Sequence, residues 1–106
     1  MINPKNNEEL KKLIIDGVIN CNGQDLICDF DIDIDADINN AEDITAWNIK
    51  AWNIDARHID AKDIIAWNIT YYAVCFAYYN IRCKSIKGRR ENSKHFVLDG
   101  KIEVGE

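Results

Sequence analysis

Alanine recurs at every fifth position of this chain seven times in succession, from Ala36 to Ala66. An isoleucine stands two positions before most of these alanines, so the repeating unit is I-x-A-x-x, as in Ile44-Thr45-Ala46. Neither a helix, with about 3.6 residues per turn, nor a flat strand of period two produces a five-residue repeat. A fixed self-similar period is typical of a solenoid, in which each unit is buried only by stacking on its neighbours.

Residues 26–38 alternate between apolar and acidic side chains, which is the period of a strand with one buried and one solvated face. This segment leads directly into the pentads, which continue in weaker form to Ile86. Larger residues, such as Tyr71 and Phe76, then occupy the alanine register, and they predict that the coil widens or that its core is filled differently. The sequence therefore predicts a single all-β domain over residues 1–106, with the solenoid over residues 26–86.

The two ends of the solenoid are expected to be closed by other elements. Residues 7–16 predict a short amphipathic helix that Asn7 caps and Gly17 ends. Residues 95–104 predict a β-hairpin, because Asp99-Gly100 lies between alternating apolar residues. An uncovered end would expose unpaired backbone groups and favour edge-to-edge association.

Between Ile34 and Ile86 the pentads resemble the pentapeptide-repeat family, whose members fold as right-handed quadrilateral β-helices. The resemblance implies four pentads, or about twenty residues, in each coil. It implies that Trp47 stacks on Trp67 and Trp52 on Tyr72. The family places a small residue two positions before a large one, whereas here isoleucine precedes alanine, so a solenoid with a different cross-section is the alternative. Some pentapeptide-repeat proteins inhibit topoisomerases by presenting an acidic, DNA-like surface, and small acidic proteins of phages inhibit CRISPR nucleases in the same way. The resemblance therefore also suggests an inhibitor, such as a small protein of a phage or mobile element.

A dense group of carboxylates is the first candidate binding surface. On one strand the outward aspartates would lie about 6.7 Å apart, which is twice the rise per residue. Such a row could imitate the phosphates of DNA to a DNA-binding protein, although duplex DNA carries about one charge per 1.7 Å. The alternative is a solvated face that keeps the protein soluble. The predicted acidic face comprises Asp29, Asp31, Asp33, Asp35, Asp37, Glu42 and Asp43.

The same carboxylates match the ligand positions of an EF-hand loop, with Asp31 at position 1 and Glu42 at position 12. Position 6 of that loop needs a sharp turn and normally carries glycine, but here it is Ala36. Helices that would flank the loop are also missing from the pattern. The sequence therefore predicts no metal site.

Aromatic residues form the second candidate binding surface. Trp47, Trp52 and Trp67 share one pentad position and are expected to face outward, where Tyr72 would join them. Exposed aromatic patches often mark protein interfaces. The alternative is that these rings form stacked columns that only stiffen the coil.

Two further segments near the carboxyl end bear on association. Residues 71–79 contain no charge, and we expect them to be core rather than an exposed pairing edge. The basic residues that follow could contact nucleic acid or an acidic partner, or balance the acidic face of a second copy. They are Arg82, Lys84, Lys87, Arg89, Arg90 and Lys94.

Composition narrows the functional classes. His58 and His95 are the two histidines, and neither lies in a recognisable nucleophile or metal motif. Four cysteines match no zinc spacing and suit buried thiols in a reducing compartment. No apolar run is long enough for a membrane helix, and the amino terminus has no apolar core of a signal peptide. We therefore expect a cytoplasmic, non-enzymatic protein without catalytic residues, metal or cofactor.

Charge is divided unevenly along the chain. Residues 1–69 carry 14 acidic against 6 basic side chains, whereas residues 70–106 carry 4 against 7. Two functions fit these patterns. The first is an acidic, DNA-like inhibitor of a DNA-handling protein, such as a CRISPR nuclease complex or a topoisomerase, with no direct binding of nucleic acid. The second is a structural or oligomerisation module that pairs copies, as in a homodimer, or docks a partner through aromatic and apolar surfaces.

Overall fold

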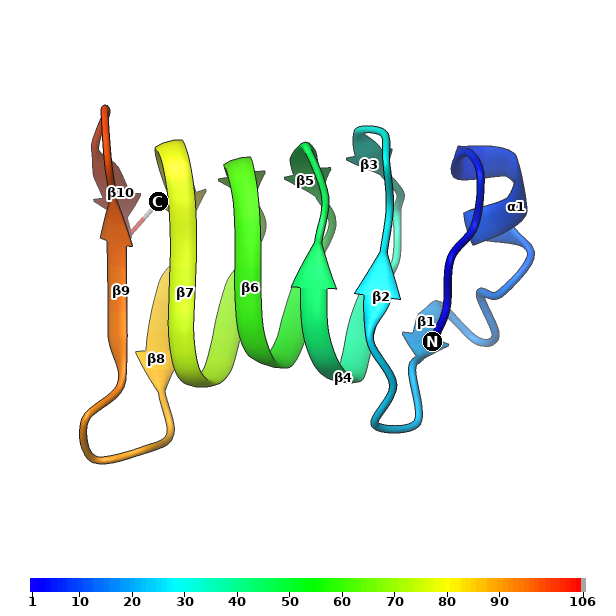
Figure 1. The fold of residues 1–106 in the computed structure, drawn as a ribbon, viewed down its shortest axis with the longest axis horizontal. Helices are drawn as coiled ribbons and strands as arrows, with labels where there is room; N and C mark the ends of the chain where they lie inside the picture. The colour runs from blue at the N-terminus through cyan, green and yellow to red at the C-terminus, as the bar shows by residue number, and fades with distance from the viewer. Residues whose placement is uncertain (106) are drawn as a thin grey trace.

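The structure of the protein, a computed structural model, describes residues 1–105 as an all-β solenoid of about five turns with one short helix (Figure 1). The elements follow in the order α1 (Asn7–Lys11), β1 (Val18–Asn20), β2 (Leu26–Ile27), β3 (Ile32–Asp33), β4 (Asp37–Thr45), β5 (Asn48–Lys50), β6 (Asn53–Ile65), β7 (Asn68–Cys83), β8 (Ser85–Gly88), β9 (Lys94–Val97) and β10 (Ile102–Val104).

Strand pairing divides the solenoid into three faces of stacked parallel strands. Face A comprises β1, the first parts of β4, β6 and β7, and β8. Face B comprises β2, the end of β4, the middle parts of β6 and β7, and β9. Face C comprises β3, β5, the ends of β6 and β7, and β10. We name the edges between them AB, BC and CA, in the order in which the chain passes round them.

The predicted twenty-residue coil is wrong, because three pentads complete a turn rather than four. Asn53 lies opposite Asn68, and Ile44 opposite Ile59, each 15 residues further along the chain. Each pentad therefore supplies one face and one edge. The solenoid has the different cross-section that the order of isoleucine and alanine left open.

Isoleucine and alanine together form the core. In the pentad turns the central isoleucine of each face points inward and stacks on the isoleucine of the next turn, as Ile49 does on Ile64, until Cys75 follows Ile59 on face B. The pentad alanines lie two residues later and are also buried, where their small side chains leave room for the chain to turn at the edges. Burial of each isoleucine side chain stabilises the fold by about 1.5–3 kcal/mol relative to exposure.

The alternating segment over residues 26–38 is not one strand. It contains β2, β3 and the start of β4, which lie on faces B, C and A in turn. The alternation itself persists round the edges, because Cys28, Ile32 and Ile34 are all buried. Inward and outward side chains therefore keep alternating where the chain turns at an edge, so the period of two does not distinguish one long strand from a turning coil.

The coil widens towards the carboxyl end, as the larger residues predict. Relative to β6, strand β7 has register shifts at edges AB and BC, so Asp63 lies opposite Asn80, 17 residues later. Tyr71 occupies the column of Ala56 and is buried. Its hydroxyl lies 2.6 Å from Nδ1 of His95 in the last turn, and burial raises its pKa.

The amino-terminal end is closed, but the helix is shorter than the predicted range of residues 7–16. Asn6, rather than Asn7, caps α1 by accepting a hydrogen bond from the Glu9 N–H, and the helix ends at Lys11. The Asn7 side chain instead bonds the outer edge of β3. Its amide donates to the Asp31 carbonyl (2.9 Å) and accepts from the Asp33 N–H (3.0 Å).

The other two faces are also covered at this end. Ile2 pairs with Leu26 of β2, and Ile15 pairs with Val18 of β1. Between Ile15 and Val18, Asp16 and Gly17 both have positive φ angles, of 52° and 78°. This is the backbone of a tight turn that glycine favours. Gly17 therefore serves this turn rather than the end of the helix.

The predicted hairpin over residues 95–104 is wrong. Strands β9 and β10 do not pair with each other; both lie parallel to β7, on faces B and C, and complete the last turn (Figure 1). Asp99-Gly100 lies at edge BC between them. Glycine is needed there because a Cβ would collide with the carbonyl of Tyr79, not because the chain reverses.

Two neighbouring isoleucines test the assignment of inward and outward positions. Ile64 is fully buried, whereas Ile65 points outward and is 44% exposed. We expect Ile64→Ala to lower the free energy of unfolding by about 2–5 kcal/mol, and Ile65→Ala by less than about 1 kcal/mol. Urea denaturation followed by circular dichroism measures both, and equal losses would contradict the assignment.

Candidate binding surfaces

The 15-residue turn places the aromatic residues on three separate edges. Trp52 stacks on Trp67 at edge CA, with ring centroids 5.1 Å apart and planes 2° from parallel. The ammonium of Lys84 continues this column, 5.6 Å from the Trp67 ring. Trp47 lies at edge BC, where Lys62 covers its ring at 5.3 Å. Tyr72 lies at edge AB beneath Arg57.

The predicted aromatic face of Trp47, Trp52, Trp67 and Tyr72 is therefore not one surface. Neither predicted stack forms, because residues twenty apart belong to different edges. The alternative interpretation, stacked columns that stiffen the coil, describes Trp52 and Trp67. A lysine or arginine cation over each column adds about 0.5–1 kcal/mol at an exposed site.

The seven carboxylates of the predicted acidic face surround one turn instead of lining one strand. Asp29 precedes β3, Asp31 and Asp33 lie on face C, and Asp35 lies at edge CA. Asp37 begins face A, Glu42 lies at edge AB, and Asp43 begins face B. The predicted single row is wrong, because the chain turns twice between Asp29 and Asp37.

Two of these carboxylates have a structural role. Asp37 Oδ1 accepts hydrogen bonds from the backbone N–H and the side-chain amide of Asn53, at 3.0 and 3.1 Å. Asp31 Oδ1 accepts from the Asn48 N–H at 3.3 Å. Each aspartate thereby bonds the backbone of the next turn just where it enters a face.

These bonds belong to polar ladders that run along the solenoid at the start of the faces. On face A the ladder continues from Asn53 to Asn68 and then to Ser85. On face C, Asp63 accepts from the Asn80 N–H, and Asn80 accepts from the Lys101 N–H. Sequence reasoning missed these residues, although a signal was present: an asparagine or aspartate precedes most of the pentad isoleucines.

Glu42 is engaged in a different way. Its carboxylate lies 3.8 Å from Arg57 in the next turn, and both side chains are about half exposed, so the pair contributes little to stability. Of the remaining four residues, Asp43 is half-buried, whereas Asp29, Asp33 and Asp35 are exposed. Within residues 1–105 the carboxylate oxygens of these three exposed residues make no hydrogen bond or ion pair.

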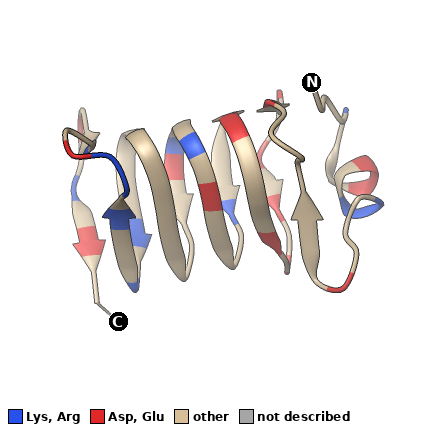
Figure 2. Cartoon of the chain, turned by 90° about the horizontal axis from the view of Figure 1, so that it is seen from below, with Lys and Arg blue, Asp and Glu red and all other residues tan. Residues whose placement is uncertain are grey.

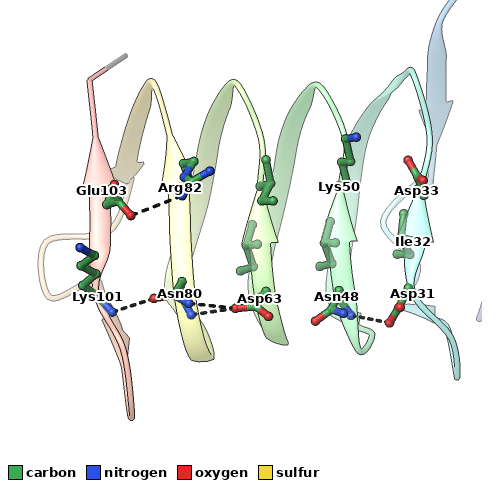
Figure 3. Close-up of a pocket in the computed structure, with 13 residues that line it drawn as sticks. Asp31, Ile32, Asp33, Asn48, Lys50, Asp63, Asn80, Arg82, Lys101 and Glu103 are labelled. Atoms are coloured by element: carbon green, nitrogen blue, oxygen red, sulfur yellow. Dashed lines mark hydrogen bonds and ion pairs between the residues drawn. The ribbon is translucent and has the colours of Figure 1, made fainter.

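Face C holds a shallow depression of about 770 Å³ (Figure 3). Its floor is the outward column Asp33, Lys50, Ile65, Arg82 and Glu103, one residue from each turn. Arg82 and Glu103 form an ion pair at 3.6 Å. The depression therefore offers two basic side chains beside one apolar side chain and an acidic side chain at each end, rather than a field of one sign.

Charge varies along the solenoid axis more than between faces. The seven predicted carboxylates lie in residues 29–43, near the amino-terminal end, and that segment contains no basic side chain. The basic cluster Arg82–Lys94 lies in the last two turns (Figure 2). The acidic segment of residues 29–43 and the basic cluster therefore lie in different turns of the solenoid.

The uncharged segment over residues 71–79 is only half core. Tyr71, Ala73, Cys75 and Ala77 are buried. The side chains between them point outward and meet residues of the last turn. Phe76 packs against Phe96 with centroids 5.1 Å apart. We call this outward group the carboxyl-terminal apolar patch, and it consists of Val74, Phe76, Tyr78, Tyr79, Phe96 and Leu98.

The last turn also presents an uncovered edge. Within residues 1–105, strands β8, β9 and β10 pair only with β7, and each leaves its other side without a strand. The core is open here: Val104 stands in the inward column of buried Cys83, yet it is 53% exposed. This is the end that the predicted hairpin was expected to close.

The cysteines are core residues. All four are free and buried, and burial raises the pKa of Cys21 to about 11 and that of Cys28 and Cys75 to about 12. Since the thiolate is the reactive form, these thiols are poor nucleophiles near neutral pH. In the described part of the chain, no group of three or more His, Cys, Asp or Glu side chains is arranged to hold a metal ion.

Comparison of the chain with protein-family models, curated proteins and solved structures finds no match. In residues 1–105, no helix has the length and apolar character needed to cross a membrane. The candidate surfaces must therefore be judged on their own geometry.

Asp37 tests the structural role of the ladders. We expect Asp37→Ala to lower the free energy of unfolding by about 1–3 kcal/mol, because the Asn53 N–H loses its acceptor. Asp37→Asn keeps an acceptor oxygen and should cost less. Asp35→Ala is the matched control, since that exposed carboxylate makes no bond within residues 1–105, and it should change stability by less than about 0.5 kcal/mol. Equal effects of Asp37→Ala and Asp35→Ala in urea denaturation would show that the ladder contributes nothing.

Proposed function

We propose that this protein is a non-enzymatic assembly module that associates with protein through the carboxyl-terminal end of its solenoid. The observation that carries the proposal is the uncovered edge of β8, β9 and β10, beside an exposed core residue, Val104. Unpaired strand edges form backbone hydrogen bonds with another chain readily. The contrast with the amino-terminal end supports it, because all three faces are covered there.

The carboxyl-terminal apolar patch enlarges this surface. Phe96, Tyr78, Tyr79 and Leu98 are 46%, 41%, 42% and 66% exposed. Since an aromatic side chain carries roughly 150–250 Å², these fractions amount to on the order of 300–400 Å² of apolar surface. A patch of that size is the largest on many monomers and is often functional. Buried at an interface, it would supply the aromatic contacts that dominate binding energy.

A second candidate function is the acidic inhibitor of a DNA-handling protein. It is favoured by the free carboxylates of Asp29, Asp33 and Asp35, which lie in one turn with no basic residue beside them in sequence. It is weakened by the distribution of the seven carboxylates round the coil, because a DNA-like surface needs them on one side. The ladder bonds of Asp31 and Asp37 weaken it further.

Affinity capture with four forms of the tagged chain tests the assembly function. Each tagged bait is incubated with a lysate of the source cells, to which untagged chain is added so that self-association is detected as well. Val104→Lys places a charge at the open edge, and Ile65→Lys is the matched control on face C, where the side chain is similarly exposed. We expect wild type and Ile65→Lys to retain protein and Val104→Lys to lose it. Retention by Val104→Lys equal to wild type would contradict the assembly function.

The fourth bait, with Asp29, Asp33 and Asp35 changed to Asn, tests the acidic inhibitor. That function predicts a captured DNA-binding protein which this triple variant loses and which high salt releases. The assembly function predicts no effect of the triple variant. Failure of the wild-type bait to retain any protein would contradict both functions.

A further inference from the structure

Resting on the proposed assembly function, we propose that the partner at the open end is a second copy of this chain. The two copies would join end to end about a two-fold axis that passes through β9. Strand β9 would pair with β9 of the second copy, and β8 with β10.

The rise of the coil selects this axis. Strands β8, β9 and β10 follow one another round a single turn, so each lies about a third of the roughly 4.8 Å coil step further along the solenoid. A two-fold through β9 exchanges β8 with β10, and because β9 lies midway between their heights, all three gaps between the copies are equal. An axis through β8 or β10 would make the gaps differ by about one coil step. Only the axis through β9 pairs all three strands at once.

The strands would meet antiparallel, a pairing at least as stable as the parallel pairing inside the solenoid. Residues directly opposite in such a pair point to the same side, so inward residues must face inward ones. Two registers satisfy this rule, because Ile102 and Val104 both stand in the inward columns of buried residues of β7. Ile86 opposite Ile102 of the second copy would place Lys87 opposite Lys101, whereas Ile86 opposite Val104 places Lys87 opposite Glu103. Repulsion between like charges therefore selects the register in which Ile86 faces Val104. Within one copy Lys87 and Glu103 are on different faces, since β8 lies on face A and β10 on face C.

Complementary charges also meet at the edges. The two-fold exchanges edge AB with edge BC, which brings the loop that holds Arg89 and Arg90 beside Asp99 of the second copy. On face B the axis can place Phe96 opposite its own counterpart, as an outward aromatic pair. The arrangement thus covers Val104 and pairs Phe96 with its counterpart, two side chains that are about half exposed in the single copy.

The area of the end face indicates how strongly two copies would bind each other. The solenoid measures 25 by 23 Å across its shorter dimensions, so an end-to-end contact falls in the class below roughly 1,200 Å² that is typical of weak complexes. We expect a dissociation constant in the micromolar range, from about 1 to 100 µM. The contact is isologous and uses both open ends, so it closes as a dimer and does not extend into fibres.

Exchanging the charges of Lys87 and Glu103 by mutation tests the arrangement. Sedimentation velocity of the full chain over a range of concentrations measures the dissociation constant of the dimer. We expect wild type to dimerise, and Lys87→Glu or Glu103→Lys to weaken the dimer about three- to tenfold, because each change creates two repulsive pairs. The double variant restores both pairs in the dimer and should return the dissociation constant to within about twofold of wild type. Thermal unfolding of each variant checks that the monomer is intact, since Glu103→Lys also removes the ion pair with Arg82.

A dimer that the double variant fails to restore would overturn the proposed axis. A wild-type chain that sediments as a monomer at every concentration would overturn the second copy as partner. Either result is separate from the assembly function itself, which fails only in the capture experiment, when wild type retains no protein or Val104→Lys retains as much as wild type.

Discussion

The fold depends on the stacking of the central buried isoleucines of one turn on those of the next. This contact repeats on all three faces, for example from Ile38 to Ile54 and from Ile49 to Ile64, and the parallel backbone pairing runs beside it. Stacking buries each turn only against its neighbours, so the turns in the middle are the best covered and the ends need another solution. The small alanines at the edges let the chain bend without opening the core. Every outward position then becomes free for polar or aromatic residues.

Stacking also places identical outward positions directly above one another, which would be unfavourable for a column of like charges. The polar ladders avoid this by mixing carboxylates with amides. Asp37, Asn53, Asn68 and Ser85 form one such column, in which each of the first three side chains accepts a hydrogen bond from the turn that follows. The edge columns follow the same rule, since a cation lies over an aromatic ring in each of them. Two of the seven carboxylates that suggest a binding surface, those of Asp31 and Asp37, thus bond one turn to the next.

The two ends of the solenoid differ, and that asymmetry supports the proposed role in assembly. At the amino-terminal end, the Asn7 amide imitates the backbone of a further strand on β3, and Ile2 and Ile15 cover the other two faces. At the carboxyl-terminal end the strands of the last turn are left with one free side, next to aromatic residues and basic side chains. An edge of this kind is normally protected in soluble proteins. A partner strand is the most direct protection.

The sequence by itself determined the solenoid and the identity of the core residues, because a period of five with buried Ile and Ala admits no ordinary helix or sheet. Beyond Ala66 it left open whether the coil widens or its core is filled differently. It could not determine how many pentads make a turn. Since every pentad carries the same Ile and Ala, a shift of 15 or 20 residues superposes them equally well, and the match of Trp47 with Trp67 was no more specific than that of Trp52 with Trp67. Only the tertiary structure decided the number, because it depends on the angle at the edges and on the hydrogen bonds between turns. That number then placed the four aromatic residues on three edges and spread the seven carboxylates round the coil. It also turned the residues about Asp99-Gly100 from a hairpin into part of a last turn, because β9 and β10 each pair in parallel with a different part of strand β7.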